Sequence, residues 1–205
     1  MSNFETPFAR VIVVEIQRPH GAATKHRVPL EITEEEIYWL RSRDMSDSPK
    51  IGGEEYFSEH DVTPPTKVTS DDLPPAETDA VREIDREAVE QKKPHGKWQV
   101  TGSADRVEEL WPELLRDAED GTIWAAKAMT AFGYNNLPMY DDYILTVYTP
   151  NYFEKHDVDR VREHLRDARG VDHELYYKPD IYTKKGIVAD TVEEFGLSAP
   201  ARYIE

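Results

Sequence analysis

The chain has 205 residues, enough for one domain with a sizeable core, and its formal net charge is −16. Acidic residues outnumber basic ones by 41 to 25, which excludes general nucleic-acid binding, because phosphate contacts need a basic surface. The acidity is spread along the chain, and we interpret it as an adaptation to a high-salt cytoplasm, where screening removes self-repulsion.

The composition also excludes several kinds of chemistry. There is no cysteine, so disulfides and thiolate catalysis are absent. No apolar run approaches the length of a membrane span, and the first residues lack the pattern of a signal peptide. The seven histidines lack metal-ligand spacing. The sequence therefore predicts a soluble cytoplasmic protein without membrane contact, metal or cofactor.

Residues 1–43 are expected to form an N-terminal extension of strand, hairpin and helix. The run 11–16 is rich in β-branched residues and predicts a strand. Residues 26–32 are the expected hairpin partner of that strand. A capping box that begins at Thr33 then predicts a short helix through Leu40.

Two further zones follow this extension. Residues 44–76 contain five prolines, many Ser, Thr and Asp and few apolar side chains, which predicts a mobile acidic linker. Residues 77–205 are expected to form the core domain, with a helical lead-in over 78–91 and a C-terminal tail. The tail is predicted to contain one short helix near 192–195.

The core domain is predicted from its hydrophobic periodicity, which switches between strand and helix patterns. The expected order is strand, helix, strand, strand, helix, strand, strand, and the elements fall at 98–100, 103–120, 122–129, 143–148, 156–168, 175–178 and 180–183. The segment 131–139 is expected to be a loop. This order predicts an α+β fold, a mainly antiparallel sheet with helices packed on one face.

Cations are scarce in this chain, yet several gather at the start of the apolar half. Lys93, His95 and Lys97 lie within five residues, and Lys127 lies inside an apolar run between two alanines. Burial disfavours the ammonium form, so the pKa of a lysine in such a run is expected to fall. The grouping predicts a place that holds a negatively charged ligand.

Five short blocks of the core resemble the basophilic-leukaemia-expressed protein family, a domain of unknown function. The blocks lie at 96–98, 107–111, 126–127, 147–149 and 177–183, so the resemblance covers roughly 95–187. The family is similar in fold to the cap-binding translation initiation factor, which implies the same fold here. That factor stacks the cap between two tryptophans. Trp98 and Trp124 are candidates for aromatic contacts, but the resemblance does not imply cap binding itself.

A second resemblance concerns chemistry. Phosphothreonine lyases use a Lys-x-His motif, then a lysine, a tyrosine and arginines, and Lys93-Pro-His95 is similarly followed by Lys127, Tyr148 and Arg202. The residues that flank these positions do not match that family. The resemblance implies β-elimination from a phosphorylated peptide or a small phospho-ligand. Lys127 would be the base and His95 the acid, and the phosphate would be held by Lys93, Lys97, Lys178 and Arg202.

Two hypotheses from different classes therefore stand. The first is a phosphothreonine-lyase-like carbon–oxygen lyase, which a buried Lys127 close to His95 would favour. The alternative is a non-catalytic nucleotide- or protein-binding module with a fold like that of the cap-binding factor. An exposed Trp98 or Trp124 beside Lys178 would favour this second hypothesis.

Overall fold

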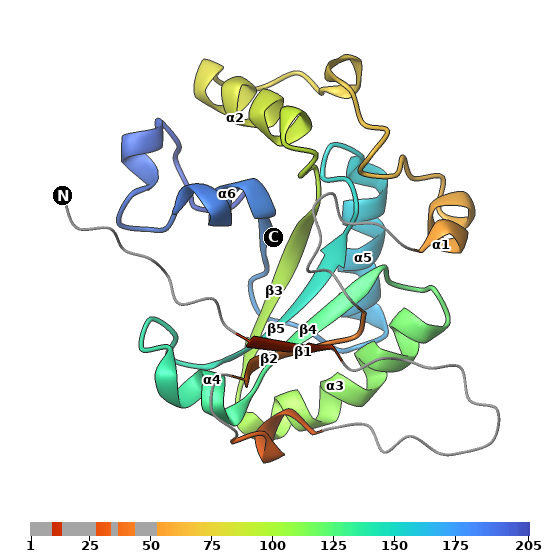
Figure 1. Ribbon diagram of the computed structural model, residues 1–205, viewed down its shortest axis with the longest axis vertical. Helices are drawn as coiled ribbons and strands as arrows, with labels where there is room; N and C mark the ends of the chain where they lie inside the picture. Colours follow the sequence, from red (N-terminus) through yellow and green to blue (C-terminus); the bar gives the residue numbers. More distant parts are fainter. Residues whose placement is uncertain (1–9, 14–27, 34–36, 44–52) are drawn as a thin grey trace.

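The computed structural model describes residues 10–13, 28–33, 37–43 and 53–205, and its described strands form one sheet (Figure 1). The strand order is β1-β2-β4-β5-β3-β6-β7; β1 and β2 are parallel, and every other neighbouring pair is antiparallel. The strands are β1 (Arg10–Val13), β2 (Ile37–Arg41), β3 (Gly96–Gly102), β4 (Ala125–Met129), β5 (Tyr143–Thr149), β6 (Tyr176–Pro179) and β7 (Tyr203–Ile204).

The helices include two long ones that cover a single face of this sheet. Figure 1 shows α3 and α5 on the same side of the strands. The α-helices are α1 (Glu54–Glu59), α2 (Asp79–Glu90), α3 (Ala104–Glu119), α4 (Ala131–Asn136), α5 (Lys155–Asp167) and α6 (Asp180–Lys185), and the short 3-10 helices are η1 (Pro29–Glu31), η2 (Ser70–Asp72) and η3 (Val192–Phe195). The predicted α+β fold with a mainly antiparallel sheet is confirmed.

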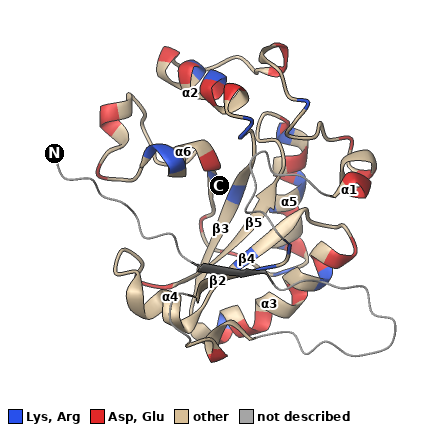
Figure 2. Cartoon of the chain, in the orientation of Figure 1, with Lys and Arg blue, Asp and Glu red and all other residues tan. Residues whose placement is uncertain are grey.

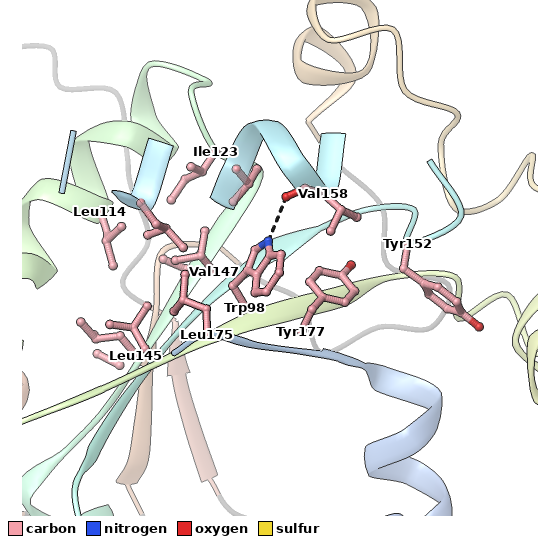
Figure 3. Packing of buried hydrophobic residues seen from close by; sticks show 14 of the residues in the cluster. Trp98, Leu114, Ile123, Leu145, Val147, Tyr152, Val158, Leu175 and Tyr177 are labelled. Carbon is pink, nitrogen blue, oxygen red and sulfur yellow. Dashed lines mark hydrogen bonds between the residues drawn. The ribbon is translucent and has the colours of Figure 1, made fainter. Parts of the chain in front are cut away.

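The main core lies between the sheet and these two helices. Trp98 of β3 is fully buried there, and its indole Nε1 donates a hydrogen bond of 2.9 Å to the carbonyl oxygen of Val158 in α5 (Figure 3). Leu114 of α3 and Val147 of β5 pack in the same cluster. Fully burying an aliphatic side chain of this size contributes about 1.5–3 kcal/mol, so this layer accounts for much of the hydrophobic stabilisation.

The predicted helices over 78–91, 103–120 and 156–168 are confirmed as α2, α3 and α5. Thr78 and Ser103 cap the first two, because their side chains accept from the backbone N–H groups of Val81 and Arg106. None of the described helices is long and apolar enough to cross a membrane.

The N-terminal predictions are partly wrong. The residues expected to reach Leu40 as a helix form strand β2, which hydrogen-bonds to β1 on one side and β4 on the other. The backbone of this short segment is satisfied by sheet pairing, which overrides the local helix signal. The expected hairpin strand over 26–32 contains the helix η1 instead, with Pro29 at its first position. Residues 34–36 lie outside the described residues.

The segment expected to be a mobile linker holds ordered structure over residues 53–76. Helix α1 buries Tyr56 and Phe57, and the Tyr56 hydroxyl donates a hydrogen bond of 2.8 Å to Asp157 Oδ1 in α5. The buried Val68 belongs to the main core. These apolar contacts hold 53–76 against the domain, which the proline content alone did not reveal. Residues 44–52 lie outside the described residues.

Two further segments differ from the sequence prediction. The expected loop over 131–139 begins with α4, where the Thr130 hydroxyl accepts from the Gly133 N–H at 2.9 Å. The expected strand 180–183 is helix α6. Its first turn carries Asp180 and its last turn two lysines, which complements the helix dipole, and Gly186 ends it at φ +70°.

Candidate binding face of the sheet

The described strands carry positive charge and no negative charge. Each of β1, β2, β3, β4 and β6 contains one basic residue, and no described strand contains Asp or Glu. Figure 2 shows the acidic residues on helices and connecting segments instead. The basic residues of the strands are Arg10, Arg41, Lys97, Lys127 and Lys178. In a chain with 41 acidic and 25 basic residues, this is a local concentration of cations.

The strand register brings most of these cations to one face. Across the sheet, Arg41 lies opposite Lys127, Lys127 opposite Thr146, and Thr146 opposite Gln99. In the next row, Lys97 lies between Tyr148 and Lys178. Residues directly opposite each other in a ladder share a face. We call this set, together with Trp39, the basic face: Trp39, Arg41, Lys97, Gln99, Lys127, Thr146, Tyr148 and Lys178.

The basic face is the side turned away from α3 and α5. Its residues alternate along the strands with Trp98, Ala126, Ala128 and Val147, which belong to the core cluster that contains the buried residues of both helices. Successive side chains of a strand point to opposite faces. The same strands therefore present an apolar layer to the helices, and on the other side they place the basic face beside the buried apolar residues Ala125, Met129 and Ile144.

Trp39 and Lys127 form one part of the basic face. Both side chains are half-buried, and the Lys127 Nζ lies 3.8 Å from the centre of the Trp39 ring, a close cation–π contact. The ring of Tyr140, from the segment after α4, meets the Trp39 ring edge-on at a centroid distance of 6.3 Å. This end of the face therefore combines an aromatic platform with an ammonium group.

Lys97 forms a second part of the face, and Asp180 fixes it. The Lys97 Nζ donates hydrogen bonds to Asp180 Oδ1 at 2.5 Å and to Thr183 Oγ1 at 3.0 Å. Burial by itself lowers the pKa of Lys97, but Asp180 and the Tyr148 hydroxyl outweigh it, and the net pKa is raised. Lys97 is therefore a fixed positive charge, and its Nζ lies 5.8 Å from the centre of the Tyr148 ring.

Lys178 adds a second ammonium group beside Lys97. Its Nζ donates a hydrogen bond of 2.7 Å to the carbonyl oxygen of Ile187. Burial, and then the charge of Lys97, lower the pKa of Lys178 from 10.5 to about 8. Burial raises the pKa of Tyr140, and the charge of Lys97 offsets part of that rise, so Tyr140 also lies within the field of Lys97. Tyr140 therefore links the two ends of the face.

The structure gathers four of the predicted site residues on the basic face, namely Lys97, Lys127, Lys178 and Tyr148. The predicted acid His95 lies beside them at the start of β3, but its side chain is buried, and its Nε2 is 3.1 Å from Asp180 Oδ2. Lys127, the predicted base, contacts Trp39 instead. The contacts described for the two residues are therefore with Asp180 and with Trp39, and a lyase pair of His95 and Lys127 stays a prediction.

The other predicted residues lie elsewhere. Trp98 faces the helices, and Trp124 is fully buried, with its ring 6.3 Å from that of Phe57 in α1. Neither tryptophan is exposed beside Lys178. Arg202 pairs with the buried Asp85 of α2 at 3.0 Å, and therefore fastens the C-terminal segment to that helix. Lys93 follows α2, where its backbone N–H donates to the Ala88 carbonyl at 2.7 Å.

Sequence reasoning missed Trp39, Arg41, Gln99, Thr146 and Tyr140. The signal for Trp39 was present, because a strand period over 37–41 places Trp39 and Arg41 on one face, whereas a helix period separates them. Tyr140 had no such signal, since it reaches the face from a segment outside the strands. Among the described residues, no group of three or more His, Cys, Asp or Glu is arranged to hold a metal ion.

Fold and site together define an α+β protein with one sheet, whose long helices cover one face and whose other face is basic and aromatic. The family model of the basophilic leukemia-expressed protein Bles03 matches residues 53–186, well over half of the chain. The chain therefore belongs to this family. The matched segment contains the whole basic face except Trp39 and Arg41, which lie on β2.

The solved structures that are similar to this chain include two of schistosome eIF4E, one complexed with m7GpppA and 4E-BP and the other with m7GpppG and 4E-BP. Each aligns with a TM-score of 0.40 and 15% identity over 82% of this chain, and over 93% and 94% of those chains. We infer no ligand for this chain from a likeness of that extent.

Proposed function

We propose that this protein is a non-catalytic binding module that holds a nucleotide on the basic face of its sheet. The observation that carries the proposal is the distribution of charge. The described strands contain basic residues and no acidic ones, although the chain has a net charge of −16. Lys97, Lys127 and Lys178 share that face with Trp39 and Tyr148.

The phosphate groups of the nucleotide fit the end of the face at Lys97 and Lys178. Ammonium groups form charge-assisted hydrogen bonds with phosphate oxygens, which are stronger than neutral ones. Asp180 offsets one of the two positive charges and fixes the Lys97 side chain. The pKa of Lys178 is low because burial and the charge of Lys97 disfavour its ammonium form. The negative charge of a bound phosphate would stabilise that form.

The ring of the nucleotide fits the other end. Aromatic side chains stack on bases of any sequence, because every base has a π-face, and such stacking contributes about 1–3 kcal/mol per base. Trp39 is half-buried, whereas the other three tryptophans, Trp98, Trp111 and Trp124, are at most 1% exposed. Trp39 is thus the tryptophan available for stacking, and Tyr140 lies next to it.

The geometry favours binding over the lyase chemistry suggested by the sequence. Elimination of phosphate needs a base at the Cα proton and an acid at the leaving oxygen of the same ligand. His95 is 0% exposed and lies against Asp180, whereas Lys127 lies over Trp39. We therefore expect no loss of phosphoric acid when a phosphothreonine peptide is incubated with the protein and analysed by mass spectrometry.

The direct test is titration with nucleoside mono-, di- and triphosphates, followed by tryptophan fluorescence and by calorimetry. We expect quenching of Trp39 and a measurable heat for at least one nucleotide. Lys178→Met should weaken that affinity about tenfold, the effect of one charge-assisted hydrogen bond. Lys67→Met is the matched control, because Lys67 is an exposed lysine outside the sheet, and its loss should leave the affinity unchanged.

The proposal fails if a folded protein, verified by circular dichroism, gives neither quenching nor heat with any nucleotide at low or at molar salt. Both salt levels are tested because salt screens charge contacts and weakens binding that depends on them. Molar salt is included because the acidic composition predicts a high-salt cytoplasm. A phosphothreonine peptide belongs in the same panel. Binding of that peptide in place of every nucleotide would identify a phosphorylated protein as the ligand and contradict the proposal.

A further inference from the structure

The hydroxyl group of Thr146 is a feature of the basic face that the proposed function does not yet use. Thr146 is 4% exposed, and its Oγ1 has no hydrogen-bond partner among the described residues. Burial of a hydroxyl group without a partner is unfavourable, since its hydrogen bonds to water are lost and nothing replaces them. Such an atom calls for an explanation in each case.

A requirement for β-structure does not explain this threonine. Valine has the same shape and an equal preference for strands, and it carries no hydroxyl group to satisfy. The neighbours of Thr146 in β5, which face the helices, are the apolar Leu145 and Val147. The hydroxyl group therefore has a use only on the basic face.

The position of Thr146 suggests what that use is. It lies at the centre of the face, opposite Lys127 on β4 and Gln99 on β3. The half-buried Gln99 brings a side-chain amide, which both donates and accepts hydrogen bonds. Lys97 is a diagonal neighbour of Thr146, and diagonal positions in a ladder are about 7–8 Å apart. A single nucleotide can bridge this separation.

We propose that Thr146 and Gln99 form a hydrogen-bonding subsite that binds the polar edge of the nucleotide base, between the ring site at Trp39 and the phosphate site at Lys97 and Lys178. This inference rests on the proposed function, and it adds the two side chains that distinguish a nucleotide from a ligand without a base. A ligand with a donor or acceptor on its ring satisfies the Thr146 hydroxyl group. Inorganic pyrophosphate occupies the phosphate site alone and leaves the hydroxyl group unsatisfied.

The test is the isosteric variant Thr146→Val, measured first without ligand. If the hydroxyl group has no partner in the free protein, its removal should raise the melting temperature, by about 2–4 °C for a chain of this size. The same variant should bind the best nucleotide of the panel about tenfold more weakly and bind inorganic pyrophosphate as the natural chain does. Thr146→Ser keeps the hydroxyl group and should retain most of the nucleotide affinity.

Thr101→Val is the matched control, because Thr101 is an exposed threonine of β3 on the same side of the sheet. It should change neither the melting temperature nor either affinity. The inference is overturned if Thr146→Val binds the nucleotide as tightly as the natural chain, or if it lowers the melting temperature, and nucleotide binding itself would still stand. If the natural chain binds no nucleotide, the proposed function falls first, and the subsite falls with it.

Discussion

The two faces of the sheet come from the same strands and differ in almost every property. On β3 and β5, Trp98 and Val147 face α3 and α5 and are fully buried among apolar side chains. The alternate positions Lys97, Gln99 and Thr146 are polar or charged. The comparison shows that one period-2 pattern can place a stabilising layer on one side of a sheet and cations on the other, where we propose that a ligand binds.

The largest expected effect is a difference in stability between variants of two tryptophans, one on each face of the sheet. Trp98→Ala removes a fully buried ring and its hydrogen bond to Val158, and should lower the free energy of unfolding by about 4 kcal/mol. Trp39→Ala removes a half-buried ring and should cost little stability, but weaken nucleotide affinity about tenfold. Urea denaturation measures the free energy of unfolding, and calorimetry measures the nucleotide affinity without relying on the fluorescence of Trp39. Equal losses of stability in the two variants would contradict the expected difference between the faces.

The next effect tests the charges within the basic face. Asp180→Asn leaves the buried ammonium group of Lys97 without its carboxylate, and should lower the free energy of unfolding by about 3 kcal/mol. The double variant Lys97→Met with Asp180→Asn removes both charges and should recover most of that loss. A double variant no more stable than the single one would show that the pair is not the source of the effect.

The smallest effect is a pH dependence that belongs to the basic face alone. The pKa of Lys178 is about 8 in the folded chain, below its ordinary 10.5, because of burial and the nearby charge of Lys97. Nucleotide affinity should therefore fall about five- to tenfold between pH 7 and 9, as Lys178 loses its proton. Lys97 remains charged over this range, because its pKa is raised. Lys178→Met should abolish the dependence, and an unchanged pH profile in that variant would assign it to another group.

The same pKa has the opposite effect on stability. Between about pH 8 and 10.5 the unfolded chain holds more protons at Lys178 than the folded chain does. The free energy of unfolding of the free protein should therefore rise with pH across this window, while anion affinity falls. Thermal denaturation of the natural chain and of Lys178→Met at several pH values measures this contribution.

The sequence predicted the elements whose pattern is long and periodic. Helices α2, α3 and α5 carry apolar residues at helical spacing, and β5 is a run of strand-forming residues. Several short elements were misassigned, because their state depends on distant partners. Strand β2 is held by β1 and β4, and α6 is positioned by Asp180, whose backbone N–H donates to the His95 carbonyl at 3.0 Å.

The candidate site could be predicted only in part, for the same reason. Lys97 and Lys127 were identified because grouped cations, and a cation inside an apolar run, are visible in the sequence, whereas Tyr148 and Lys178 came from the resemblance to phosphothreonine lyases. Their common face depends on the strand order, which pairs β3 with both β5 and β6. His95 is buried against Asp180, which is far from it in the chain, and no local sequence pattern predicts this contact.

The boundary of the family match passes through the ring end of the proposed site. Lys97 and Lys178 lie inside the matched segment 53–186, and Trp39 lies outside it on the five-residue strand β2. Exchange of strand β2 would therefore alter the stacking residue Trp39, while the groups proposed to hold the base edge and the phosphate stay in place. A graft of residues 37–41 between two members of this family would change the strength of stacking and leave the proposed base-edge subsite at Gln99 and Thr146 unchanged.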